Sequence, residues 1–144
     1  MTLRLTTAQR EEIRRHGEKT YPYECCGVLT GETAADGTKR VLQVVACNNA
    51  DSDKPQRWYE ISPRDLVRIQ REAYERGEDI LGFYHSHPDA PPRWSSSDLA
   101  EAHWLGCSYV ITSVEKGKAV QTNSFELKGD ETAKRFEEEE ISIE

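Results

Sequence analysis

The sequence contains no apolar run that approaches the ~18 residues of a membrane-spanning helix, which argues against a helical membrane protein. The N-terminal residues Met1–Leu5 lead at once into a charged segment with no apolar core, so a secretory signal peptide is not expected. Basic residues are in deficit, because 19 lysines and arginines face 26 aspartates and glutamates, for a net charge of −7. Without a basic stripe, the sequence argues against nucleic acid as the main partner.

A C-x-x-C pair is also absent, which argues against a zinc ribbon and against a thioredoxin-type redox site. The chain has four cysteines, Cys25, Cys26, Cys47 and Cys107. Cys25 and Cys26 are adjacent and cannot easily form a disulfide with each other. Since no export signal is expected, we predict four reduced thiols in a cytoplasmic protein, most of them small buried residues.

The chain of 144 residues has the length of one domain, expected over residues 1–144 with an acidic C-terminal segment over 130–144. Helices are predicted where a capping residue precedes a helical pattern and a glycine ends it, from Thr6 or Thr7 to Gly17, from Ser62 to Gly77, and from Ser95 or Ser96 to Gly106. Apolar and β-branched runs predict strands over Cys26–Thr30, Lys39–Cys47, Trp58–Ile61, Ile80–Tyr84, Tyr109–Val114 and Ala119–Leu127.

The end of the chain fits two patterns, a helix over Thr132–Glu140 or a strand that includes Ile141 and Ile143. The acidic run Glu137–Glu140 is expected to be solvated. Helices and strands alternate early in the chain and a hairpin follows late. The predicted fold class is therefore α/β or α+β, a single domain around one mixed sheet.

The most informative segment is His85-Ser86-His87, directly after the strand predicted at Ile80–Tyr84. Side chains alternate between the two faces of an extended chain, so His85 and His87 point to the same side. Two neutral imidazoles on one side can share a metal ion, and imidazole is a common zinc ligand. The alternative is that two polar residues simply end a strand.

A third donor follows at Asp98, in the first turn of the helix predicted after a proline-rich loop. That loop is long enough to fold the helix start back onto the strand end. Two histidines and one carboxylate would leave a fourth zinc position for water, as in catalytic zinc sites. The alternative role of Asp98 is to cap its own helix together with Ser95, in the pattern Ser-x-x-Asp.

Water at such a site still needs a base, and Glu24 is the candidate, because it lies just before the predicted strand at Cys26. A carboxylate beside a metal can accept the proton of the water and pass it to a leaving amine. The alternative is an ordinary surface glutamate, of which this chain has many.

These segments together resemble the JAMM (MPN-type) zinc metallopeptidases. The resemblance is carried by Glu24-Cys25-Cys26-Gly27-Val28-Leu29-x-Gly31, then His85-Ser86-His87-Pro88, then Ser95-x-x-Asp98, with the ten-residue gap between His87 and Asp98 that the family shows. The matching frame spans residues of about 5 to 128. The resemblance implies a mixed, curved sheet flanked by helices.

The resemblance also implies roles for particular residues. His85, His87 and Asp98 look like the ligands of one Zn²⁺ ion per chain, and Glu24 looks like the general base and proton shuttle. Ser95 looks like the residue that helps to stabilise the oxyanion of the tetrahedral intermediate. Many relatives have a proline just before this serine, whereas this chain has Trp94, which changes the cleft wall rather than the zinc site.

The short chain looks like the compact prokaryotic group of this family. The resemblance implies cleavage of a peptide or isopeptide bond at the C-terminal tail of a small ubiquitin-like, β-grasp sulfur carrier. The loops 48–57 and 88–94 are expected to flank the substrate groove. Two alternatives remain: a catalytically silent MPN scaffold that only binds partners, and a peptidase of cell-wall or phage-tail type with the same zinc site.

Overall fold

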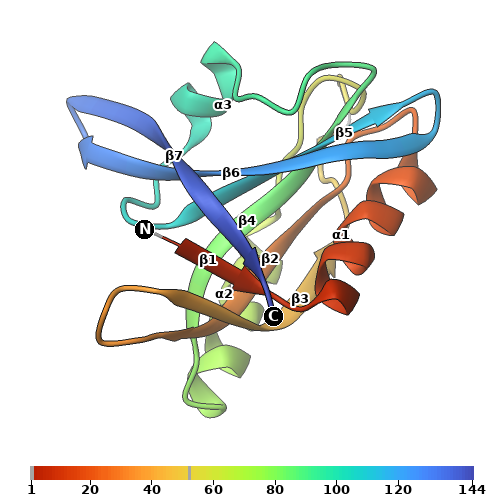
Figure 1. The fold of residues 1–144 in the computed structure, drawn as a ribbon. Coiled ribbons are helices and arrows are strands. Elements are labelled where there is room, and N and C mark those ends of the chain that lie inside the picture. The colour runs from red at the N-terminus through yellow and green to blue at the C-terminus, as the bar shows by residue number, and fades with distance from the viewer. Residues whose placement is uncertain (1, 52) are drawn as a thin grey trace.

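The computed structural model describes residues 2–51 and 53–144, which form three helices and seven strands (Figure 1). In chain order these elements are β1 (Thr2–Leu5), α1 (Thr7–Thr20), β2 (Cys26–Thr33), β3 (Lys39–Cys47), α2 (Pro63–Glu75), β4 (Asp79–Pro88), α3 (Ser96–Glu101), β5 (Ser108–Glu115), β6 (Lys118–Asp130) and β7 (Ala133–Ile143).

The strands form one closed barrel in the order β1-β3-β2-β4-β5-β6-β7. β2 pairs antiparallel with β3 and β4, whereas β4 pairs parallel with β5. β6 and β7 continue the sheet as antiparallel strands, and β7 closes it by pairing parallel with β1, as Figure 1 shows at the front of the molecule. The mixed sheet with flanking helices confirms the predicted fold class, while its closure through β1 was not predicted.

Helix α1 begins as the sequence predicted, because Thr6 and Gln9 form a reciprocal capping box. The helix does not stop at Gly17 but continues to Thr20. A Cβ atom at Gly17 would lie 3.0 Å from Cγ2 of Val114 on β5. Gly17 therefore allows the helix to approach the sheet closely and does not end it.

Helix α2 begins at Pro63 after the capping residue Ser62, as predicted. It packs on β2 and β4 through its buried residues Ile69 and Ala73. The central strands β2 and β4 are buried on both faces, with Leu29 in the cluster beneath α1 and Phe83 in the cluster beneath α2. Burial on both faces explains why these strands read as continuous apolar runs.

Further predictions are corrected or decided by the structure. Helix α3 ends at Glu101 rather than Gly106, because Ala102 is extended and buried. At this end of the helix, the Nζ of Lys134 donates to the carbonyl groups of Leu99, Ala100 and Ala102. The segment 58–61 forms no strand, although it is described throughout. The open choice at the C-terminus is resolved as the strand β7.

The acidic run is not wholly solvated, because Glu139 points inward from β7 and is buried. The Nζ of Lys39 lies 3.3 Å from Oε2 of Glu139 and 2.8 Å from Oε1 of Glu126. The hydroxyl groups of Ser108 and Ser124 donate to the other oxygen of Glu139. These three partners, Lys39, Ser108 and Ser124, satisfy the buried carboxylate of Glu139, so one glutamate of the run is part of the closed barrel's interior and not of its solvated surface.

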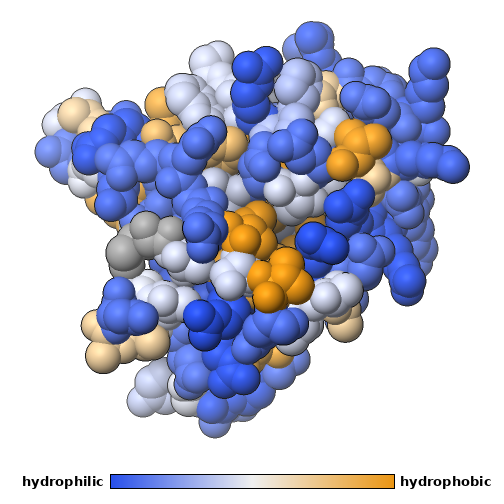
Figure 2. Space-filling view, viewed as in Figure 1, coloured by the Kyte–Doolittle hydropathy of each residue, from blue (hydrophilic) through white to orange (hydrophobic). Residues whose placement is uncertain are grey.

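The face seen in Figure 2 is largely hydrophilic, with small hydrophobic groups between charged residues. None of the described helices is long and apolar enough to cross a membrane. All four cysteines are free and buried, which confirms their prediction as small interior residues.

Candidate metal centre and catalytic cleft

The two histidines lie within β4, which extends beyond the predicted end at Tyr84 to Pro88. Both are buried, and they share the face of the strand that carries Phe83. The Nε2 atoms of His85 and His87 are 3.1 Å apart. Alternation along the strand therefore brings the two imidazoles together, as expected from the His-x-His spacing.

Asp98 reaches the histidines from the first turn of α3. Its Oδ1 lies 3.3 Å from Nε2 of His85, and its Oδ2 lies 3.1 Å from Nε2 of His87. The same carboxylate accepts the backbone N–H of Ser95 at 2.9 Å, while the Ser95 hydroxyl accepts the backbone N–H of Asp98 at 3.1 Å. Asp98 thus caps its helix and faces the histidines at the same time, so the two roles considered for it are compatible.

The charges of this cluster depend on its contacts. Burial alone would raise the pKa of Asp98, but the hydrogen bonds from His85 and His87 outweigh it and hold that pKa well below its usual range. Burial lowers the pKa of His85, which favours a neutral ring. For His87, burial opposes the charged form, yet the hydrogen bonds with Asp98 and with the Pro91 carbonyl raise its pKa.

The donor set fits a zinc ion. Nδ1 of His87 donates to the carbonyl oxygen of Pro91 at 2.9 Å, which leaves its Nε2 lone pair facing Nε2 of His85 and the carboxylate. At these distances the two nitrogens and the carboxylate need a proton or a cation between them, so a metal ion would take the place of the proton that the imidazoles otherwise share with Asp98. His85, His87 and Asp98 each offer one donor atom within 4.8 Å of the others. Neutral imidazole and carboxylate are both zinc ligands, with bonds of about 2.0–2.2 Å.

The His85 ring is held from outside the strand by Tyr59, which stacks on it with ring centres 4.4 Å apart. Tyr59 was not predicted as part of the site. Its signal is weak, since it lies in the segment expected to be a strand, and only the tertiary structure brings it against β4.

Glu24 lies beside the histidines because β2 and β4 pair in antiparallel register. Cys26 is opposite His85, and the N–H of Cys25 donates to the hydroxyl of Ser86 at 2.8 Å. Extending this register by one pair places Glu24 opposite His87, with its side chain on the same face. Glu24 is buried, and its Oε1 has no hydrogen-bond partner among the described residues. Burial is the main reason that its pKa is raised to about 8.

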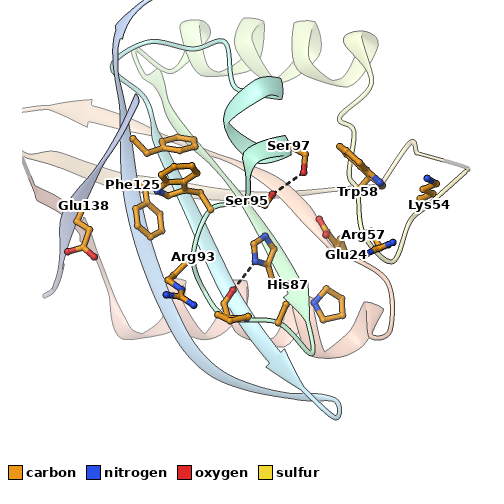
Figure 3. A pocket seen from close by; sticks show the side chains of 15 residues that line it. Glu24, Lys54, Arg57, Trp58, His87, Arg93, Ser95, Ser97, Phe125 and Glu138 are labelled. Carbon is orange, nitrogen blue, oxygen red and sulfur yellow. Dashed lines mark hydrogen bonds between the residues drawn. The ribbon is translucent and has the colours of Figure 1, made fainter. Parts of the chain in front are cut away.

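A cleft of about 850 Å³ opens over Glu24 and His87 (Figure 3). Both loops predicted to flank the groove contribute to it, the first through Lys54 and Arg57 and the second through Pro91 and Arg93. Ser95 lines it as well. The sequence analysis did not identify the residues of the C-terminal hairpin that complete the wall, namely Phe125, Phe136 and Glu138.

Asn49 was also missed, although it connects Glu24 to the loop that follows β3. Its Nδ2 donates to the carbonyl groups of Glu24 at 3.3 Å and Trp58 at 2.9 Å. Its Oδ1 accepts the N–H groups of Asp51 at 2.9 Å and Glu60 at 3.1 Å. Each end of the amide therefore makes two hydrogen bonds, which join the two ends of the loop to the backbone of Glu24.

We expect Asn49→Ala to lower the free energy of unfolding by about 1–3 kcal/mol, because it removes these bonds and leaves half-buried backbone groups unsatisfied. Urea unfolding followed by circular dichroism measures the change. Asn48→Ala is the control, since Asn48 is the exposed neighbour. Equal losses in the two variants would contradict the role given to Asn49.

Comparison with known proteins places these features in a family. The family model for prokaryotic homologues of the JAB domain matches residues 6–128. The chain is 32% identical to a desampylase of Haloferax volcanii over 146 residues, covering 99% of this chain and 96% of the relative. It is 29% identical to a probable TtuB-protein conjugate cleaving protease of Thermus thermophilus, covering 76% of this chain and 68% of the relative.

A tail tip assembly protein of Escherichia phage N15 is 31% identical, covering 74% of this chain and 39% of that longer protein. Two solution structures resemble the fold over the full chain. A protein from Desulfitobacterium hafniense matches with a TM-score of 0.80 and 30% identity, covering 94% of that chain, and one from Salinibacter ruber with 0.75 and 37%, covering 92%. The matched region runs from the cap of α1 into β6, the strand that carries the cleft residue Phe125. This chain therefore belongs to the prokaryotic JAB-domain family.

Proposed function

We propose that the protein is a zinc-dependent metallopeptidase that hydrolyses a peptide or isopeptide bond at the C-terminal tail of a small ubiquitin-like protein. One observation carries the proposal. The donor atoms of His85, His87 and Asp98 converge where His87 and Glu24 line a cleft, and the buried Oε1 of Glu24 has no hydrogen-bond partner among the described residues. Such an arrangement of three ligands and one free carboxylate is typical of catalytic rather than structural zinc sites.

A zinc ion held by these ligands supplies a Lewis acid that polarises a carbonyl group and makes water more acidic. Glu24 then acts as a proton carrier through Oε1, which is free to accept a proton. A carboxylate beside a metal can accept the proton of a water molecule and pass it to a leaving amine. The hydroxyl of Ser95 lines the cleft and can donate to an oxygen on which negative charge develops.

The relatives support the class of substrate. Desampylase and TtuB-protein conjugate cleaving protease are names for proteins that act on protein conjugates. This chain spans 96% of the length of the desampylase, so the similarity extends over nearly the whole of that relative. We therefore extend cleavage of modifier conjugates to this protein.

Metal analysis and a cleavage assay test the proposal together. We expect about one zinc ion per chain in protein purified without a metal-affinity tag. Linear fusions in which each ubiquitin-like β-grasp protein of the same genome precedes a reporter should be cut after the tail, and a chelator should abolish the cut. Mass spectrometry identifies the bond. Zinc binding without cleavage of any fusion would overturn the proposed class of substrate. Absence of zinc after reconstitution would favour a binding scaffold.

A peptidase of cell-wall or phage-tail type is the second candidate, and the similarity to a phage tail tip assembly protein favours it. This chain spans only 39% of that relative, whereas it spans nearly all of the desampylase. Adding purified peptidoglycan to the same assay distinguishes the two substrates. Release of peptides from peptidoglycan, with no fusion cut, would favour the second candidate.

Ser95→Ala is expected to lower kcat by about a hundredfold with little change in KM, since the hydroxyl acts on charge that develops during the reaction. The structure adds a second effect, because Ser95 also caps α3 and its loss costs about 1 kcal/mol of stability. Ser95→Thr keeps a hydroxyl and a cap, so it separates the roles. Loss of zinc from Ser95→Ala would show that the cap on the Asp98 helix, and not the oxyanion, is what matters.

A further inference from the structure

The cleft has two chemically different sides, which meet at His87 in its centre. Figure 3 shows Phe125 and Arg93 on one side of His87, and Trp58, Arg57 and Lys54 on the other. The two sides come from distant parts of the chain. The loop after β3 forms one side, and the loop between β4 and α3 forms the other together with the hairpin of β6 and β7. A polypeptide lying across the catalytic centre must therefore contact both sides.

The side formed by the loop after β3 is positively charged. Lys54 and Arg57 are exposed, and neither forms an ion pair with any residue that the structure describes. The loop aspartates Asp51 and Asp53 do not line the cleft, and Asp51 accepts backbone N–H groups of its own loop instead. Two cations with no ion pair among the described residues therefore face the cleft in a chain of net charge −7, where they can attract acidic side chains.

The opposite side is aromatic. Trp94 is 40% exposed, and its ring centre lies 5.6 Å from that of Phe136. Phe136 in turn packs against Phe125 and Tyr109, which hold it in place. Arg93 and Glu138 also line this side, so their charges offset each other. An exposed tryptophan supported by buried aromatic rings is the kind of surface that takes up an apolar side chain of a protein partner.

We propose that the cleft selects an extended polypeptide tail with acidic side chains on one side of the scissile bond and an apolar side chain on the other. The acidic residues face Lys54 and Arg57, and the apolar residue packs on Trp94 and Phe136. The inference rests on the proposed function for the position of the scissile bond, and it specifies the sequence of the substrate around that bond.

Equilibrium binding of labelled peptides tests the selection without any need for turnover. The probes are fluorescein-labelled decapeptides with a central Gly-Gly. One side of the Gly-Gly carries Asp, Asn or Lys, and the other side carries Leu or Ser. Each peptide is made in two orders, with the polar side either N-terminal or C-terminal to the Gly-Gly. Fluorescence anisotropy with the zinc-loaded full chain gives Kd, and mass spectrometry checks that each peptide stays intact. In one order, the Asp peptide should bind roughly three- to tenfold tighter than the Asn peptide, and the Lys peptide weakest. The Leu peptide should bind about tenfold tighter than the Ser peptide.

Matched variants assign the two preferences. The double variant Lys54→Gln, Arg57→Gln should lose the preference for Asp, whereas Arg71→Gln, which removes an exposed cation of α2 that does not line the cleft, should keep it. Trp94→Ala should lose the preference for Leu, whereas Tyr74→Ala, at a fully separate exposed aromatic residue of α2, should keep it. Added salt should weaken only the first preference.

Equal binding of all peptides, no measurable binding, or unchanged preferences in the cleft variants would overturn the inference. These outcomes differ from a failure of the proposed function. Selective binding of the acidic peptides with no cleavage of any fusion would refute the hydrolase and leave the cleft selectivity standing. Cleavage of a fusion with no selective binding would support the hydrolase and refute the cleft selectivity.

Discussion

Glu24→Gln should reduce kcat by at least about a hundredfold while zinc content stays at the level of the unchanged protein. The amide keeps the shape of the side chain but cannot accept a proton, and Glu24 lies outside the set of His85, His87 and Asp98 that could hold a metal ion. Turnover of a cleavable fusion and elemental analysis of the same sample measure the two quantities. Retained activity would remove Glu24 as the base, and lost zinc would show that it holds the metal.

Glu75→Gln is the control for this substitution, because it removes an exposed carboxylate of α2 without touching the cleft. It should leave both turnover and zinc content unchanged. A similar fall in the control would mean that overall charge, and not the position of Glu24, determines the rate.

Glu24→Gln should also be more stable than the unchanged protein when both are free of metal. Burial raises the pKa of Glu24 from 4.5 to about 8. Between these two pH values the folded protein binds more protons than the unfolded chain, so its free energy of unfolding falls as pH rises. Glutamine does not ionise, so the variant should lack this fall, and its advantage should grow from about pH 4.5 to about pH 8. Urea unfolding across this range, with a chelator present, measures the difference.

Asp98→Ala should lose most of the bound zinc and, with it, essentially all turnover. Both oxygens of Asp98 face the histidines, and the alanine would leave two imidazoles to hold the ion alone. Asp98→Asn should lose zinc as well, because the amide keeps a capping oxygen but carries no charge. Zinc content by elemental analysis after dialysis is the measurement. Full zinc occupancy in either variant would contradict the assignment of Asp98 as a ligand.

Asp65→Ala provides a control for the loss of a carboxylate from the first turn of a helix. Asp65 occupies the same position in the first turn of α2 that Asp98 occupies in α3, behind the capping residue Ser62. Its removal should cost a few tenths of a kcal/mol to about 1 kcal/mol of stability and no zinc. If Asp65→Ala also lost zinc, destabilisation would explain the result at Asp98.

Local signals in the sequence predicted much of the fold. The capping residues Thr6, Ser62 and Ser95 each precede a helix at the expected place, because a cap depends only on residues one turn away. The strand over Lys39–Cys47 was predicted with its observed bounds. The fold class followed from the order of such elements. The His-x-His spacing likewise brought two imidazoles to one face, since alternation along a strand is local.

Predictions that depended on distant partners failed or were missing. Gly17 reads as a helix stop, but the approach of α1 to Val114 decides its role. Glu139 reads as a solvated charge, but closure of the barrel through β1 places it against Lys39. The helix at Ser96 ends early because Lys134, more than thirty residues later, binds its last carbonyl groups.

By itself, the sequence determined most of the helices and strands, the resemblance to a metallopeptidase family and the candidate residues His85, His87, Asp98 and Glu24. Only the tertiary structure decided that these side chains meet, that Asn49 joins Glu24 to its loop, and that a charged side faces an aromatic side across the cleft. The physical reason is that capping and alternation act within one turn or one strand. Burial, a raised pKa and the shape of a cleft arise only where segments far apart in the chain pack together.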